Sequence, residues 1–355
     1  MRPLTVEASS IEVGYPGVYD YGQGSLNLNA AYNHIFRAFE SDFPNSFDGE
    51  SLVFDLFHKY QWGDSWYTVV GFNHVAGETT YDHKRRTTNN DPYLNMVYVG
   101  DRGWNVNTGL RVNNHNTYGT HIVYHVNPSY RWKSEQGYLK VYGSYASSFI
   151  APSLTQLYGP FGANPELEPE ENVTIELGTQ WKANDRWSSG ITLFTREENQ
   201  FIDYVVINPE TFEGRYQNVE EAFTVRGVEA ELMVQPTSYL SLSANYSFTE
   251  SPDRQSLRLP KHRANADLGF TLNPATFASL RMTYVGERLD TDFTTFTSVD
   301  LSSYTLIDFY VSRQVLQEKI KVFLGINNVL NEDYTEIVGF TTQGRNVRLG
   351  FSVNL

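Results

Sequence analysis

The sequence predicts an all-β protein, a transmembrane antiparallel up-and-down β-barrel. Three observations favour this fold class. Apolar and polar residues alternate with a period of two in many short segments. The connections between these segments alternate between short and long, as turns and loops do at the two ends of a membrane barrel. Tryptophan and tyrosine gather near the segment ends, as in the aromatic girdles at a membrane interface.

The composition narrows the class of protein. The 355 residues include 24 Tyr, 22 Phe and 6 Trp but no Cys, which excludes disulfides, thiolate zinc sites and a cysteine nucleophile. The net charge of −14 argues against nucleic acid as the main partner. No stretch of about 18 apolar residues occurs, so no transmembrane helix is expected. Residues 1–24 lack the continuous apolar run of a secretory signal.

Residues 104–113 show the strand pattern most clearly. One face carries apolar or β-branched residues at Trp104, Val106, Thr108, Leu110 and Val112, and the alternate positions are Asn105, Asn107, Gly109, Arg111 and Asn113. The same alternation recurs in residues 121–132, 172–181, 240–248, 263–270 and 347–355. We predict about sixteen strands after residue 24, from Ser25–Phe39 to Gln343–Leu355. Residues 1–24 are expected to be irregular.

The connections carry a second regularity. Short ones are predicted at 62–66, 101–103, 133–137, 183–186, 235–238 and 273–275, and long ones at 39–50, 81–92, 150–170, 250–259, 287–299 and 331–343. All six Trp residues flank the short connections. A soluble sandwich would scatter its aromatic residues through a core. A propeller would show a repeat of about 40–50 residues, and we find none.

Four motifs point to a family. They are Phe149–Leu154 (FIAPSL) followed by Leu157 and Tyr158, Asn164–Glu170 (NPELEPE), Arg226–Glu231 (RGVEAE) and Ile326–Tyr334 (INNVLNEDY). In this order and spacing, they resemble the barrel part of TonB-dependent outer-membrane receptors. The match covers residues 95–355 well and 25–95 loosely. The last motif departs at two positions from the family's N-L-F-D-x-x-Y, and the chain ends in Leu355 where such barrels most often end in Phe or Trp.

The resemblance implies more strands than the chain holds. Such receptors have about 22 strands, an N-terminal plug domain inside the barrel, a TonB box and a signal peptide. We therefore expect residues 25–355 to be an incomplete receptor-type barrel with no plug domain, the C-terminal portion of a longer receptor or an engineered plugless form. Within the family, Thr283–Arg288 and Gly339–Arg345 look most similar to the vitamin B12 (cobalamin) transporter type.

The resemblance also implies a function and partners. We expect TonB-energised uptake of a scarce large ligand, cobalamin first, with a siderophore (iron-chelate) receptor as the alternative and a passive porin-like pore as the second alternative. The implied partners are the TonB complex, reached through a plug and TonB box absent from this chain, the ligand, and outer-membrane lipid and lipopolysaccharide. The protein is expected to be a monomer in the outer membrane of a Gram-negative bacterium.

Two groups of residues are candidate sites. Aromatic side chains on the long loops could form a rim that binds a large planar ligand: Tyr158, Phe161, Tyr334 and Phe340. Charged side chains on the polar faces of strands could contact a plug, or could solvate the lumen and pair with one another: Arg111, Glu176, Glu229, Glu231, Arg263 and Asp267. Loop aromatics could equally anchor the loops in the interface.

Other clusters carry simpler interpretations. The acidic residues Glu166, Glu168, Glu170 and Glu171 could bind Ca²⁺ but fit a solvated loop better. The basic run His83–Arg86 could contact lipopolysaccharide phosphates or an anionic ligand, or be a solvated loop. The eight His show no metal-ligand spacing, so we expect no metal and no cofactor. No local motif suggests a Ser–His–carboxylate set, and we expect no enzyme activity.

Overall fold

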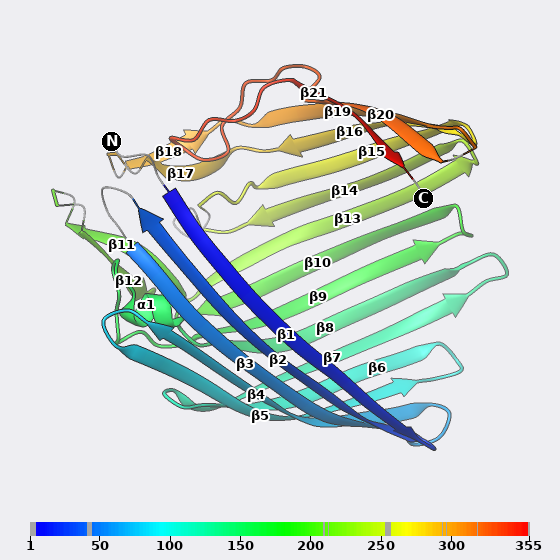
Figure 1. Ribbon diagram of the computed structural model, residues 1–355. Helices are drawn as coiled ribbons and strands as arrows, with labels where there is room; N and C mark the ends of the chain where they lie inside the picture. Colours follow the sequence, from blue (N-terminus) through cyan, green and yellow to red (C-terminus); the bar gives the residue numbers. More distant parts are fainter. Residues whose placement is uncertain are drawn as a thin grey trace. The chain divides into compact units, whose positions relative to one another are not determined.

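The computed structural model describes residues 5–40, 45–208, 210–211, 213–252, 257–292, 294–295, 297–317 and 319–353. Nearly all of the regular structure is β (Figure 1), and the predicted all-β class is confirmed. The one helix in the described ranges, α1 (Leu154–Tyr158), has five residues. Across these ranges, none of the helical structure is long and apolar enough to cross a membrane.

Seventeen strands belong to one sheet. They are β1 (Thr5–Tyr21), β2 (Gly24–Glu40), β3 (Asn45–Gln61), β4 (Trp66–Thr80), β5 (Lys84–Val99), β6 (Trp104–His115), β7 (Gly119–Lys133), β8 (Tyr138–Ile150), β9 (Glu170–Lys182), β10 (Trp187–Asn199), β13 (Phe223–Thr237), β14 (Leu240–Glu250), β15 (His262–Asn273), β16 (Thr276–Val285), β19 (Tyr304–Val315), β20 (Ile320–Asn327) and β21 (Asn346–Val353). Two separate hairpins are formed by β11 (Ile202–Asn208) with β12 (Glu213–Asn218), and by β17 (Arg288–Asp292) with β18 (Thr297–Leu301).

The strands pair antiparallel with their neighbours along the chain. This holds for β1 through β7, and for β13 through β16 followed by β19 through β21. Within the described residues, sixteen strands of this sheet begin at or after residue 24, close to the predicted number, and the hairpin strands β11, β12, β17 and β18 raise the total to twenty. The expectation that residues 1–24 are irregular was wrong, because β1 occupies Thr5–Tyr21 and pairs with β2 along its whole length. Leu355 lies outside the described residues.

The connections alternate as the sequence indicated, with a correction near the N-terminus. Short turns join β3 to β4 and β9 to β10, whereas residues 151–169 and 328–345 form long loops. The predicted long loops 39–50 and 81–92 are mostly strand, since β3 begins at Asn45 and β5 at Lys84. Strands β2 to β5 have 15 to 17 residues, more than the 9–11 needed to cross a bilayer.

The chain divides into two compact units. Unit 1 comprises Met1–Tyr130, Gly143–Ile175 and Glu197–Ala222, and unit 2 comprises Arg131–Tyr142, Glu176–Arg196 and Phe223–Leu355. Buried apolar side chains are few among the described residues, whereas exposed large apolar side chains are many. A sheet with this distribution does not have the packed interior of a soluble domain.

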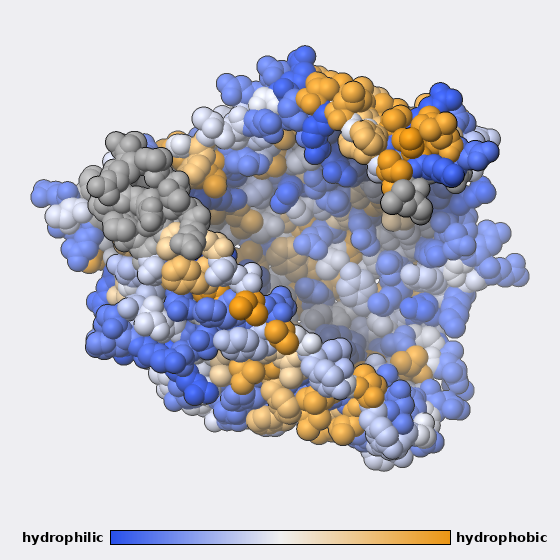
Figure 2. All heavy atoms as spheres, in the orientation of Figure 1, coloured by the Kyte–Doolittle hydropathy of each residue, from blue (hydrophilic) through white to orange (hydrophobic). Residues whose placement is uncertain are grey.

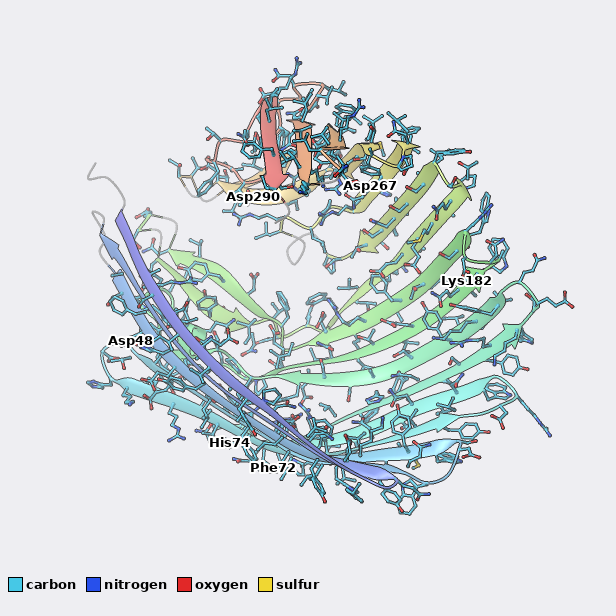
Figure 3. All side chains as sticks on the ribbon, turned by 45° about the vertical axis from the view of Figure 1, so that its right-hand side comes forward. Asp48, Phe72, His74, Lys182, Asp267 and Asp290 are labelled. Carbon is cyan, nitrogen blue, oxygen red and sulfur yellow. The ribbon has the colours of Figure 1, made fainter. Side chains whose placement is uncertain are left out.

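In unit 1 the sheet has one apolar and one polar face. Leu94 lies between Val70 and Leu110 in the register of β4, β5 and β6, and all three side chains are exposed. Phe72 and His74 share this face of β4 (Figure 3). The intervening positions carry polar residues, among them Asp55, Asn73, Asn95 and Arg111. Exposed apolar rows on one face only are typical of strands that face lipid.

An aromatic girdle follows the short-turn end of this apolar face. Trp66 packs on Tyr98 with ring centroids 4.6 Å apart, and Trp104 packs on Tyr130 at 4.9 Å. The indole Nε1 of Trp62 donates to Thr68 Oγ1 at 2.9 Å. Amphipathic rings that are partly exposed and hydrogen-bonded suit the boundary between hydrocarbon and water.

A row of polar residues marks the other limit of the apolar band. His74 Nδ1 meets Asn90 Oδ1 at 2.8 Å, and Thr120 Oγ1 donates to Asn114 Oδ1 at 2.8 Å. From Trp104 to Asn114 the strand covers about ten residues, or ~33 Å, which a 45° tilt reduces to ~23 Å. This height matches the apolar band of about 25 Å on membrane barrels.

The sheet of unit 2 repeats the two-faced pattern. Figure 2 shows apolar residues gathered at the surface of the C-terminal strands, where Leu349 is 83% exposed and Val347 and Phe351 are also exposed. On β15, Arg263 and Asp267 alternate with Ala264, Ala266 and Leu268, and the register continues this alternation into β14 and β16. The sheet of each unit therefore has one apolar face and one polar face.

Candidate functional site

The long loop 151–169 of unit 1 is held in place by a buried asparagine. Asn164 Oδ1 accepts from the Glu166 backbone N–H at 3.0 Å and from Arg215 Nη2 at 2.7 Å. Its Nδ2 donates to the Tyr216 carbonyl at 2.8 Å. Asn218 of β12 binds the same loop through the backbone N–H and C=O of Glu168. The NPELEPE motif therefore connects this loop to the β11–β12 hairpin through hydrogen bonds.

A small apolar cluster lies next to these hydrogen bonds. Leu157, Leu167 and Ile202 are buried together, with Tyr158 and Tyr216 packed against them. The Tyr118 hydroxyl, in the turn between β6 and β7, donates to the Leu167 carbonyl at 3.0 Å. Burial raises the pKa of Tyr118 to about 12, so this hydroxyl keeps its proton at physiological pH. The loop is thus held by hydrogen bonds to the β11–β12 hairpin and by Tyr118 in the turn between β6 and β7.

Replacing Tyr118 by phenylalanine should loosen this loop. The Leu167 carbonyl would lose its hydrogen bond, at a cost of about 1 kcal/mol in local stability. Hydrogen exchange of the backbone amides in 151–169 would measure the loss. Phe161→Leu, an exposed change in the same loop, serves as the control. Equal protection in the wild type and both variants would show that the Tyr118 hydroxyl does not hold the loop.

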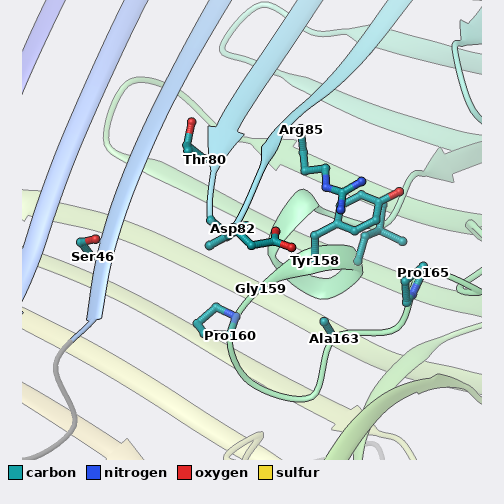
Figure 4. A pocket seen from close by; sticks show the side chains of 11 residues that line it. Ser46, Thr80, Asp82, Arg85, Tyr158, Gly159, Pro160, Ala163 and Pro165 are labelled. Atoms are coloured by element: carbon teal, nitrogen blue, oxygen red, sulfur yellow. The ribbon is translucent and has the colours of Figure 1, made fainter.

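A pocket of about 810 Å³ opens beside this anchored loop (Figure 4). Its walls come from the ends of β3 and β4, the turn that follows β4, the start of β5, and helix α1 with the residues after it; they include Thr80, Asp82, Arg85, Leu157, Tyr158 and Pro160. Helix α1 is fixed by a capping box in which Ser153 and Gln156 bond reciprocally. The Tyr81 hydroxyl meets Thr155 Oγ1 at 2.8 Å. These contacts hold α1 next to the residues that follow β4.

Arg85 is the main cation of the pocket. Its guanidinium carbon lies 4.3 Å from the centroid of the Tyr158 ring. The Arg85 Nε is buried without a hydrogen-bond partner. Asp82, across the turn, accepts from the His83 backbone N–H at 2.8 Å; this bond, with a smaller contribution from Arg85, holds the pKa of Asp82 below its usual range.

The loops of unit 2 meet at a buried carboxylate. Asp290 of β17 is 1% exposed. Its Oδ1 pairs with Arg258 Nε at 2.7 Å and accepts from Thr291 N at 2.8 Å, while Oδ2 accepts from Val338 N at 2.8 Å. Burial tends to raise the pKa of Asp290, but the Val338 N–H and Arg258 outweigh it and the pKa lies below its usual range. Asp290 thereby connects three loop segments, through Arg258, its own strand β17 and Val338 of the loop 328–345.

A second residue reinforces this junction. Arg288 is buried, and its Nη2 donates to the Thr335 carbonyl at 2.6 Å. Its guanidinium lies 5.2 Å from the Tyr304 ring, which packs on Tyr334 at 4.6 Å. Asn164 opens the NPELEPE motif and Arg288 ends the stretch Thr283–Arg288, but no role was predicted for either of them or for Asp290. Their bonding partners lie 32 to 52 residues away in the chain, so the sequence pattern does not reveal these contacts.

The structure places the four predicted rim aromatics in two groups. Tyr158 and Phe161 lie in unit 1, where Tyr158 lines the pocket and Phe161 is exposed on the following loop. Tyr334 and Phe340 lie in unit 2, where Tyr334 packs on Tyr304 and Phe340 is exposed. Their role in ligand binding remains a prediction.

The predicted lumen charges lie on polar sheet faces. Arg111 of β6 sits 5.2 Å from the Tyr93 ring in a pocket of unit 1 of about 470 Å³, where Tyr93 also donates to Asp55. A pocket of unit 2, also about 470 Å³, gathers Glu229 and Glu231 of β13 with Arg263 of β15. Asp267 pairs with Arg281 at 2.7 Å, and Glu176 lies apart on β9. Contact with a plug remains a prediction.

The charged runs separate into individual contacts. Lys84 pairs with Glu78, and Arg86 stands opposite Glu78 in the register, whereas Arg85 points to the other face. In the acidic run, Glu166 pairs with Arg215 at 3.4 Å, Glu170 accepts from the Ile202 N–H at 2.6 Å, and Glu171 meets His121 at 2.8 Å. Within the described ranges, no group of three or more carboxylates or imidazoles could hold a metal ion.

Comparison with known proteins settles the family. The family described as "TonB dependent receptor-like, beta-barrel" matches residues 7–329. The chain belongs to this family. Its match begins within β1, the strand that the sequence analysis missed, and ends within the INNVLNEDY motif.

The chain is also similar in sequence to vitamin B12 transporters. The chain is 28% identical over 252 residues to "Vitamin B12 transporter BtuB" of Vibrio cholerae serotype O1, strain O395. The same values hold for the protein of that name from strain M66-2. The alignment covers 68% of this chain and 38% of each relative. The chain thus spans well under two thirds of the proteins that it matches.

Solved structures share the fold of the chain. A mutant of the ferric enterobactin receptor PfeA from Pseudomonas aeruginosa matches with a TM-score of 0.80 at 14% identity, over 98% of this chain and 62% of that one. The siderophore receptor PirA from Acinetobacter baumannii matches with a TM-score of 0.79 at 15% identity, with the same coverage. At such low identity, these likenesses establish the fold alone.

Proposed function

We propose that this chain is the ligand-binding barrel portion of an outer-membrane receptor that takes up cobalamin with energy supplied through TonB. The observation that carries this proposal is the 28% identity to vitamin B12 transporters over 252 residues, within a family of TonB-dependent receptors. The proposed partners are the TonB complex, the ligand, and the lipid and lipopolysaccharide of a Gram-negative outer membrane. We propose that the receptor acts as a monomer and performs no chemistry on its ligand.

The surface of the sheet supports the membrane location. A band of exposed apolar side chains about as tall as a bilayer core lies between the tryptophan girdle and a polar row. Lipid cannot hydrogen-bond backbone groups, so strands that cross it must pair with one another, as β1 to β7 do. The polar face can then line an aqueous interior.

The anchored loops support ligand binding at the long-loop end. In unit 1, Asn164 and Tyr118 fix loop 151–169 beside a pocket of about 810 Å³. In unit 2, Asp290 joins three loops. Loops that are ordered before binding lose little entropy when they engage a ligand, which favours affinity. Each unit also has an exposed loop phenylalanine, Phe161 in unit 1 and Phe340 in unit 2, that suits contact with a flat ligand.

A second candidate function is uptake of an iron chelate. One observation favours it: the Arg85 guanidinium lies over the Tyr158 ring and forms no salt bridge with the described residues, and many ferric chelates are anionic. Cobalamin carries one phosphodiester and would use the same cation less extensively.

Ligand binding distinguishes the two candidates. The purified chain in lipid nanodiscs should retain cyanocobalamin in equilibrium dialysis and should not retain ferric enterobactin. Phe161→Ala and Phe340→Ala should each weaken retention of cyanocobalamin, whereas Asp101→Ala in a short turn should leave it unchanged. Retention of the ferric chelate instead would favour the second candidate. Retention of neither would contradict ligand binding by this chain.

A further inference from the structure

We propose that Arg85, whose guanidinium carbon lies over the Tyr158 ring, is a specificity-determining residue that binds an anionic group of the ligand in the pocket between the β4–β5 turn and helix α1. This inference rests on the proposed receptor function and adds to it the chemistry that one subsite recognises. The group is a phosphate, carboxylate or catecholate attached to an apolar or flat body.

The first argument is the unmet bonding of the guanidinium. An arginine side chain carries five N–H donors in a fixed fork. Its contact within the described structure is the face of the Tyr158 ring, 4.3 Å away, and Nε is buried without an acceptor. Because Nε is enclosed, the terminal nitrogens are the donors left to face the pocket, whose wall includes Arg85. A bidentate anion would satisfy them.

The second argument concerns charge. The protein has a net charge of −14, yet Arg85 forms no ion pair with the residues that the structure describes. Lys84, one residue earlier, pairs with Glu78. Asp82, the carboxylate of the same pocket, turns toward the His83 backbone N–H. In this pocket Arg85 would attract an anionic ligand, and the Asp82 carboxylate would repel it.

The third argument is that the Tyr158 ring, over which Arg85 lies, is itself held in place. Tyr158 belongs to α1, which the Ser153–Gln156 capping box and the Tyr81–Thr155 contact hold in place. Its ring packs against the cluster of Leu157, Leu167 and Ile202. Stacking on a fixed ring reduces the conformational freedom of Arg85, so less entropy is lost when it binds. Leu157 and Pro160 supply apolar wall for the body of the ligand.

A pair of small probes tests the subsite without knowledge of the natural ligand. We would titrate the full chain in nanodiscs with 2-naphthyl phosphate and with uncharged 2-naphthol, and follow probe fluorescence. The wild type should bind the phosphate at least about tenfold more tightly than the naphthol. Arg85→Gln should remove this preference, and Arg85→Lys should retain only part of it because lysine lacks the planar fork.

Neighbouring residues provide matched variants. Arg86→Gln removes the same charge one residue away, on the opposite face of β5, and should leave the preference intact. Asp82→Asn removes the opposing carboxylate and should strengthen phosphate binding several-fold. No preference in the wild type, or an equal loss in Arg85→Gln and Arg86→Gln, would overturn the proposal.

Larger probes then separate this inference from the proposed function. Cyanocobalamin contains a phosphodiester that dicyanocobinamide lacks, and ferric enterobactin is anionic whereas ferrichrome is neutral. If Arg85 reads the anion, Arg85→Gln weakens the anionic member of the pair that binds and spares the other. If neither pair binds while the naphthyl phosphate preference holds, the proposed ligands are wrong and the subsite stands. An equal effect on both members of the pair that binds overturns the subsite.

Discussion

Asp290→Ala is expected to release three loops of unit 2 from one another. The substitution removes the acceptors of Thr291 N and Val338 N and the partner of Arg258. Because the carboxylate is 1% exposed, water does not already share these bonds in the folded state. The two backbone N–H groups that lose a charged acceptor cost about 3 kcal/mol together, whereas Arg258, whose side chain is 40% exposed, stays partly solvated. Exchange of the Val338 and Thr291 amide hydrogens should accelerate about a hundredfold.

Two comparisons make this expectation specific. Asp290→Asn keeps one acceptor but removes the charge, so its effect should be smaller than that of alanine. Asp333→Ala changes an exposed carboxylate on the same loop as Val338 and should leave exchange unchanged. If all three variants exchange at the wild-type rate, Asp290 is not the junction of these loops.

The same junction should respond to acid with a defined sign. The pKa of Asp290 lies below its usual range in the folded protein. A carboxyl whose pKa is depressed by folding contributes stability above its unfolded pKa of about 4, and this contribution is lost as the pH falls through the folded value. Protection of the Val338 amide should therefore be constant from pH 7 to about 5 and decline below about pH 4. In Asp290→Asn this decline should be absent.

The strands could be predicted from the sequence where successive side chains face lipid and water in turn. In residues 104–113, one face meets lipid and the other water, so period two is visible in the sequence and the predicted strand agrees with β6. Beyond the apolar band, both faces of a strand meet water. Residues 84–90 are therefore polar on both faces and resemble a loop, although their backbone pairs with β4.

Strand β1 was missed for a related reason. Gly14, Pro16 and Gly17 interrupt the alternation of Ile11, Val13 and Tyr15. Proline cannot donate to a ladder and is confined to edge strands or strand ends. The pairing of β1 with β2 nevertheless runs through Pro16, which stands opposite Asn29. The pattern of side chains alone does not reveal that this segment pairs.

The site residues depend on contacts that sequence patterns do not record. Arg85 belonged to a basic run for which a solvated loop was the simpler interpretation, and only the placement of Tyr158, 73 residues later, distinguishes it from Lys84 and Arg86. The NPELEPE motif did identify its loop through a family resemblance. The reason for that motif, a buried Asn164 with three hydrogen bonds, became clear from the fold.

Leu110→Arg tests which face of the sheet meets lipid. Leu110 stands near the middle of the apolar band, between Trp104 of the girdle and Asn114 of the polar row, and is 46% exposed. An arginine at the midplane of a membrane strand costs about 2–4 kcal/mol. The urea midpoint of the chain folded into lipid vesicles, followed by tryptophan fluorescence, should fall by the corresponding amount.

Asn107→Arg supplies the matched control because it introduces the same side chain on the same strand. Asn107 is three residues from Leu110 and therefore lies on the opposite face of β6, where it meets His125. If this polar face lines water, the new guanidinium stays solvated and the urea midpoint should change little. Equal losses in the two variants would mean that both faces are dry. A loss confined to Asn107→Arg would reverse the assignment of the faces, and with it the location of every polar-face charge considered for plug contact.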